Sequence, residues 1–147
     1  MAPNTITLSP EQRADVLTAA LSLYSVKADA LQDALDRYLE DHQSLEPLAP
    51  HRSEIAALER ILDQLGWDFT ANQSAELTLS DRGLLFELLY DAYGQAIERL
   101  ATVIGTPSSA DFDPEDARSR VRYADGLLDL VAATAPGADQ SAQPAAE

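Results

Sequence analysis

Apolar residues recur at alternating spacings of four and three along residues 17–38, and this repeat constrains the fold more than any other feature. Its members are Leu17, Leu21, Tyr24, Ala28, Leu31, Leu35 and Tyr38. This spacing places the side chains on one side of an α-helix, as in a coiled coil. The pattern predicts one long helix from Pro10 to about His42, with Pro47 and Pro50 closing the segment.

The start of the long helix is marked by Ser9, Pro10 and Gln12. Serine at the N-cap and glutamine at N3 form a capping box, in which each side chain satisfies a backbone N–H, and proline is favoured at N1. A second apolar stripe lies beside the repeat: Val16, Ala20, Leu23, Ala30 and Ala34. Because two stripes are broader than one short helix can cover, we expect the long helix to contact more than one neighbour.

A shorter helix is predicted from about His51 to Leu65, with leucine and isoleucine side chains on one face. Gly66 is suited to the left-handed conformation that ends many helices. In a Schellman motif the second residue after the helix folds back on the last turn, so we expect Trp67 to contact Leu62 and to be buried.

Two further helices are predicted in the second half of the chain. One begins at the Ser80 cap, and the other has Asp113 as its cap and Pro114 at N1. On the last helix the apolar positions expected to be buried are Val121, Ala124, Leu127, Leu128 and Val131. Each long segment has a helical period, so we expect no sheet beyond a short extended piece near Leu77.

The segment Ile6–Ser9 has the sequence Ile-Thr-Leu-Ser, and Leu77–Ser80 has the sequence Leu-Thr-Leu-Ser. Each precedes a predicted helix that is followed by a shorter one. The helix patterns align best three residues out of register with these caps, so convergent cap chemistry is a simpler interpretation than internal duplication.

The predicted fold class is all-α and four-helix bundle-like, with one long N-terminal helix followed by three shorter helices. Residues 1–135 are expected to form a single helical domain. Residues 136–147 contain no aromatic or large aliphatic side chain and are expected to be a disordered tail.

The composition constrains both partners and location. The chain has 25 acidic and 10 basic residues, a net charge of −15, and this charge disfavours direct binding to nucleic acid or to anionic membranes. It contains no cysteine, no stretch near the roughly 18 apolar residues of a membrane span, and no N-terminal secretory signal. We therefore expect a soluble, cytoplasmic protein.

One group of acidic residues is a candidate metal site. Asp29, Asp33, Asp36 and Glu40 recur along one face of the long helix, and Glu87 with Asp91 offers a second acidic pair. All-α nucleotide pyrophosphohydrolases hold Mg²⁺ with acidic pairs on two helices in this general way, although their closely spaced glutamate pairs are absent here. We interpret the row as a solvated face, because gathering unpaired carboxylates away from water is costly.

The sequence contains no serine–histidine–acid set, phosphate-binding loop or Rossmann glycine pattern. Neither His42 nor His51 follows a glutamate at the spacing of a diiron-carboxylate bundle. We therefore predict no catalytic residues, cofactor or metal. The arginines at positions 118, 120 and 122 are expected to pair locally, Arg120 with Asp116 and Arg122 with Asp125.

By elimination, the sequence favours a non-enzymatic helical protein–protein interaction module, which binds another protein or a second copy through its apolar helix faces. Two alternatives stay open. One is a Mg²⁺-dependent hydrolase of nucleotides that uses the acids of the long helix. The other is an acidic decoy of a nucleic-acid-binding protein. Acids that converge in a cleft favour the enzyme, acids spread over a convex face favour the decoy, and peripheral acids favour the module. If Trp67 is exposed, it becomes a candidate partner-binding residue.

Overall fold

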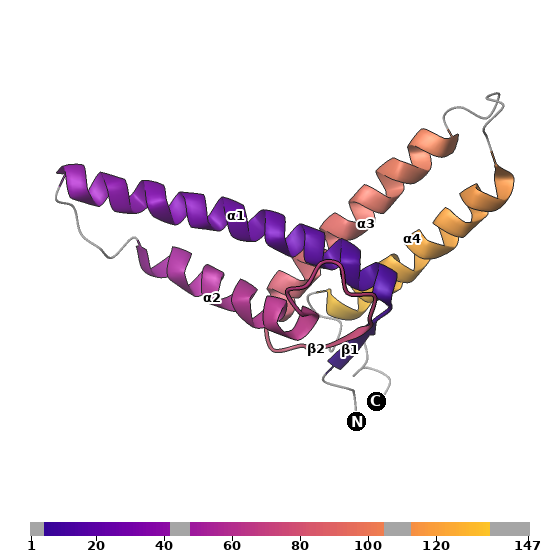
Figure 1. Ribbon diagram of the computed structural model, residues 1–147, viewed down its shortest axis with the longest axis horizontal. Helices are drawn as coiled ribbons and strands as arrows, with labels where there is room; N and C mark the ends of the chain where they lie inside the picture. Colours follow the sequence, from indigo (N-terminus) through magenta and orange to yellow (C-terminus); the bar gives the residue numbers. More distant parts are fainter. Residues whose placement is uncertain (1–4, 42–47, 105–112, 136–147) are drawn as a thin grey trace, which may run out of the picture. The chain divides into compact units, whose positions relative to one another are not determined.

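The computed structural model describes residues 5–41, 48–104 and 113–135. The elements are β1 (Thr5–Leu8), α1 (Pro10–Asp41), α2 (Leu48–Leu65), β2 (Ala75–Thr78), α3 (Arg82–Ile104) and α4 (Pro114–Thr134) (Figure 1). The predicted all-α fold class, with a long first helix followed by three shorter ones, is confirmed for these residues.

The chain divides into two compact units, Met1–Leu84 and Leu85–Glu147. The single domain over residues 1–135 stays a prediction. The tail predicted over residues 136–147 lies outside the described residues.

Both helix starts that the sequence marked most clearly are confirmed. At α1 the backbone N–H of Ser9 donates to Oε1 of Gln12 at 2.9 Å, and the N–H of Gln12 donates to Oγ of Ser9 at 3.1 Å. This is the reciprocal pair of a capping box. At α4 the Asp113 side chain accepts from the N–H of Glu115 at 3.0 Å. In both cases local chemistry alone fixes the helix boundary.

In the first unit, α1 and α2 form a helical hairpin (Figure 1). The buried side chains of these two helices are Arg13, Val16, Leu17, Ala19, Ala20, Leu58, Ile61, Leu62 and Leu65. All those from α1 lie in its first eleven residues. Farther along, Leu35 is 37% exposed and Leu39 is 62% exposed. The apolar repeat predicted along the whole helix is therefore fully covered only near its start.

The segments that echo each other in sequence pair as antiparallel strands, so the prediction of no sheet beyond one extended piece is wrong. Ile6 lies opposite Leu77, and Leu8 lies opposite Ala75. Along β2, Ala75 and Leu77 are buried while Glu76 is exposed, the alternation of a strand with one covered face. A two-stranded ribbon is marginal alone, and here β2 contacts α2.

Two predicted helix starts are shifted in the structure. Helix α2 begins at Leu48, so Pro50 lies inside its first turn instead of closing the preceding segment. Proline is tolerated there because the first-turn N–H groups have no partner within the helix. Helix α3 begins at Arg82, two residues after Ser80.

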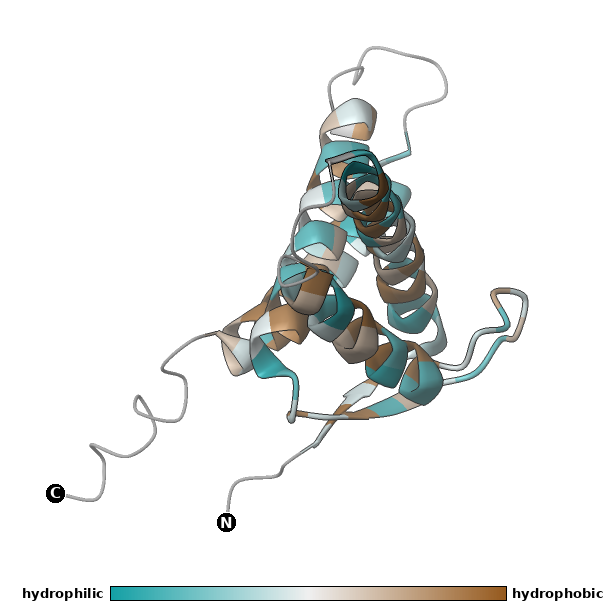
Figure 2. Ribbon diagram, turned by 90° about the vertical axis from the view of Figure 1, so that its left-hand side faces the viewer, coloured by the Kyte–Doolittle hydropathy of each residue, from teal (hydrophilic) through white to brown (hydrophobic). Residues whose placement is uncertain are grey.

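The second unit contains α4 and the part of α3 from Leu85 onward. Their buried side chains are Leu85, Leu88, Leu89, Ala92, Ala96, Ala117, Ala124, Leu127, Val131 and Thr134. Val121 and Leu128, which were expected to be buried, are 39% and 43% exposed. Figure 2 shows apolar and polar residues interleaved along the helices, as in amphipathic helices. Within the described ranges, none of the helices is long and apolar enough to cross a membrane.

Candidate interaction surface

Arg13 is 0% exposed, and its guanidinium makes four hydrogen bonds to backbone carbonyls. Its Nε donates to the carbonyl oxygen of Leu65 at 2.5 Å, and Nη1 donates to that of Ala71 at 2.9 Å. Nη2 donates to the carbonyls of Gly66 at 3.0 Å and Asp68 at 2.8 Å. The guanidinium thus holds the C-terminal end of α2 and the following loop, where the helix dipole favours positive charge.

Gly66 ends α2 in a simpler way than predicted. Its φ is +83°, and its N–H donates to the carbonyl of Leu62 at 2.9 Å, which is the single bond of an αL motif. A Cβ at this position would lie 3.2 Å from Nη2 of Arg13. The positive φ favours glycine at this position, and a Cβ would in addition crowd the Arg13 guanidinium.

The prediction that Trp67 is buried is wrong, because Trp67 is 46% exposed. Its indole N–H donates to Oδ1 of Asp63 at 2.8 Å, one turn back along α2. Its ring also meets the ring of Tyr24 at a centroid distance of 5.8 Å and an interplanar angle of 81°. Because α2 ends in an αL motif, the chain turns at Gly66 and the indole of Trp67 lies on the outer surface of the hairpin.

Tyr24 lies in the same cluster, with its hydroxyl 3.4 Å from Oε2 of Glu59. The negative charge of Glu59 raises the pKa of Tyr24 above its ordinary value, with burial and this hydrogen bond acting in the same direction. We call the set of Tyr24, Glu59, Asp63 and Trp67 the aromatic corner. Glu59 and Asp63 are four residues apart and so lie on one side of α2, and the indole hydrogen bond to Asp63 holds Trp67 beside them.

The loop after α2 has its own internal order. Oδ1 of Asp68 accepts from the N–H of Thr70 at 3.0 Å and from its hydroxyl at 2.7 Å. These hydrogen bonds, the hydroxyl bond first, lower the pKa of the Asp68 carboxyl. The loop displays Phe69, which is 52% exposed.

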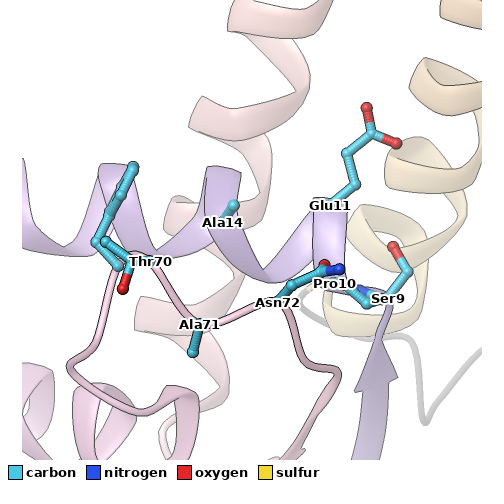
Figure 3. A pocket seen from close by; sticks show the side chains of 8 residues that line it. Ser9, Pro10, Glu11, Ala14, Thr70, Ala71 and Asn72 are labelled. Atoms are coloured by element: carbon cyan, nitrogen blue, oxygen red, sulfur yellow. The ribbon is translucent and has the colours of Figure 1, made fainter.

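A shallow groove of about 550 Å³ lies between this loop and the start of α1 (Figure 3). Its lining residues are Ser9, Pro10, Glu11, Ala14, Phe69, Thr70, Ala71 and Asn72. The last four of these come from the loop, and the first four come from the cap and the first five residues of α1. Because Arg13 donates to the carbonyls of Asp68 and Ala71, its guanidinium also fixes the position of the loop that forms one wall of the groove.

One side of α1 continues from the aromatic corner toward the far end of the hairpin. We call it the α1 flank, and its residues at spacings of four, three, four and four are Tyr24, Ala28, Leu31, Leu35 and Leu39. Leu31 is half-buried, whereas Ala28, Leu35 and Leu39 are exposed. Val26 is also 61% exposed, but it is two residues from both Tyr24 and Ala28 and so faces the opposite side.

The acidic row predicted as a solvated face is exposed along its whole length. Asp29, Asp33, Asp36 and Glu40 are all exposed, and Oδ1 of Asp36 accepts from Gln32 at 3.0 Å. Asp33 is two residues from both Leu31 and Leu35, which places it on the side of α1 opposite the flank.

The second acidic pair, Glu87 and Asp91, is exposed on α3 in the other unit. Within the part of the chain that the structure describes, no three histidine or acidic side chains are grouped so that they could hold a metal ion.

The arginines of α4 follow the prediction only in part. Nε of Arg120 donates to Oδ2 of Asp116 at 2.9 Å, as expected for residues four apart. Arg118 pairs with Glu115 at 3.4 Å. Among the described residues of α4 the ion pairs are these two, and the predicted pair of Arg122 with Asp125 is not formed. The two observed pairs are exposed and make small contributions to stability.

No family model, curated protein or solved structure matches the chain.

Proposed function

We propose that the chain is a non-enzymatic protein–protein interaction module that binds another protein through the α1 flank. The observation that carries the proposal is the exposure of Leu35 and Leu39, 37% and 62%, beside each other on one side of a two-helix hairpin. Fully burying a leucine side chain contributes about 1.5–3 kcal/mol. Adjacent exposed leucines on a regular helix are therefore a source of binding energy that the hairpin itself leaves unused.

A different protein is favoured over a second copy on electrostatic grounds. The chain has a net charge of −15, so two copies repel each other, and such a charge tends to keep a protein monomeric. The exposed acids Asp29, Asp33 and Asp36 lie on the side of the same helix opposite the flank and add to the overall negative charge. A positively charged partner with an apolar contact surface gains from the long-range attraction as well as from the leucines.

The proposal is tested by co-purification from the native host with three forms of the full chain. The first is wild type, the second carries Leu35→Ser and Leu39→Ser, and the third carries Val26→Ser on the opposite side of α1. Removing two leucine contacts is expected to lower partner recovery by about tenfold or more. Val26→Ser, which also removes an exposed apolar side chain from α1, is expected to leave recovery unchanged.

Equal recovery by all three forms, with unchanged circular dichroism, contradicts the proposal. Sedimentation equilibrium of the isolated chain separates the two kinds of partner. We expect a monomer; a dimer that dissociates when Leu35 and Leu39 are replaced assigns the flank to a second copy instead. The hydrolase and the decoy stay alternative predictions from the sequence.

A further inference from the structure

We infer that the aromatic corner binds the guanidinium of an arginine side chain on the partner protein. This inference rests on the proposed function and names the chemistry that the partner brings to the same side of the hairpin. The corner combines two aromatic rings with two carboxylates, and these groups come from α1, from α2 and from Trp67, the second residue after α2.

The arrangement of the two rings fits a cation. Tyr24 and Trp67 are close to perpendicular, at 81°, with their centroids 5.8 Å apart. The face of an aromatic ring carries negative electrostatic potential, and tryptophan gives the strongest attraction to a cation. Trp67 is 46% exposed, so part of its side chain is accessible to a guanidinium from solvent.

The two carboxylates supply the matching negative charge. Asp63 is hydrogen-bonded to the Trp67 indole at 2.8 Å and Glu59 to the Tyr24 hydroxyl at 3.4 Å, so both are held at the edge of the rings. Among the residues that the structure describes, neither forms an ion pair with a basic side chain. The same Glu59 charge raises the pKa of the Tyr24 hydroxyl.

Three basic residues of the first unit already have other partners. Arg13 is bonded to four backbone carbonyls, Lys27 pairs with Glu54, and Arg60 pairs with Asp81. A cation for the corner therefore comes from outside, and the net charge of −15 steers positively charged partners toward the chain. Arginine fits better than lysine because its planar group stacks on a ring while donating to carboxylates at its edge.

The test uses the single tryptophan of the chain, whose indole N–H gives one resolved side-chain signal in ¹⁵N–¹H correlation spectra. The probe is arginine blocked at both ends, N-acetyl-arginine methylamide, titrated into the full chain at constant ionic strength. The control probe is the citrulline equivalent, which has nearly the same shape without the charge. We expect a saturable shift of the Trp67 indole signal with the arginine probe and a much smaller shift with citrulline.

Matched variants locate the effect. Asp63→Asn keeps an acceptor for the indole but removes the charge, and it is expected to weaken binding of the probe about two- to fivefold. Asp33→Asn changes the net charge by the same amount on the opposite side of α1 and is expected to have no effect. Equal shifts with both probes, or equal weakening by both variants, overturns the inference. Because the readout does not involve Leu35 or Leu39, either result leaves the co-purification test of the flank intact.

Discussion

Replacing Arg13 by methionine removes every guanidinium hydrogen bond while keeping a long side chain at the buried position. Two effects oppose each other. Methionine avoids the cost of burying a guanidinium, which is several kcal/mol. It also leaves four carbonyl groups without their donor, those of Leu65, Gly66, Asp68 and Ala71. A buried polar group without a partner costs about 1–3 kcal/mol.

The bond to Leu65 is buried and the other three are part-buried, so the first carbonyl loses the full amount and the others recover part of it from water. We therefore expect Arg13→Met to lower the free energy of unfolding by about 2–4 kcal/mol, a large share of the roughly 5–15 kcal/mol typical of a native protein.

Urea unfolding followed by circular dichroism and by Trp67 fluorescence measures this loss. The control is Arg37→Met, an exposed arginine on the same helix, which is expected to change stability by less than about 0.5 kcal/mol. An Arg13→Met protein as stable as wild type would refute the reasoning. It would show that the cost of burying the guanidinium equals or exceeds the stability gained from its four hydrogen bonds.

Three further predictions concern local structure. Trp67→Ala is expected to cost about 1 kcal/mol or less in urea unfolding, because the side chain is 46% exposed; a loss above about 3 kcal/mol would place it in the core. Asp113→Ala is expected to cost about 1 kcal/mol by removing the cap of α4, and an unchanged urea midpoint would contradict this. Arg60 donates to both carboxylate oxygens of Asp81, and this hydrogen bonding lowers the pKa of Asp81 in the folded state. The stability that this pair contributes is present above the pKa of an unfolded aspartate, about 3.9, and is lost as the pH falls through the lower pKa of the folded state. Asp81→Asn should therefore make the urea midpoint fall less steeply below about pH 4. A wild-type and an Asp81→Asn curve of the same shape would count against it.

Features fixed by a few neighbouring residues are the ones that the sequence predicts well. The capping box of Ser9 and Gln12 and the cap at Asp113 need only short-range hydrogen bonds, and both are confirmed. The buried face of α2 also follows directly from its helical period.

Features that depend on distant segments were missed. The pairing of β1 with β2 joins four-residue strands about 70 residues apart, and their likeness in sequence is equally explained by cap chemistry. The sequence does not distinguish a Schellman ending, which would bury Trp67, from an αL ending, because both use the same glycine and differ only in backbone conformation. For Arg13 a signal existed: it lies four residues before Leu17 and seven before Ala20, so it occupies the apolar face of the helix.

For the α1 flank, the sequence predicts that an apolar surface is left uncovered but not which residues form it. The sequence indicated that the apolar stripes exceed what a short neighbour can cover, but it did not show where coverage ends. That position depends on how far α2 extends alongside α1 and on the burial that results, which are properties of the packed hairpin. The same holds for the aromatic corner, whose four residues come from segments that meet only after folding.

The most direct test of the account is whether a partner protects the α1 flank from a thiol-labelling reagent. The chain contains no cysteine, so an introduced cysteine is the only thiol of the protein that the reagent can label. Leu39→Cys on the flank and Val26→Cys on the opposite side each introduce one exposed thiol, and their labelling rates are measured in buffer and in native-host extract. The account predicts similar rates for both variants in buffer and, in extract, strong slowing of Leu39→Cys with little change for Val26→Cys. Equal slowing of both, or of neither, would contradict the claim that this side of α1 is the binding surface.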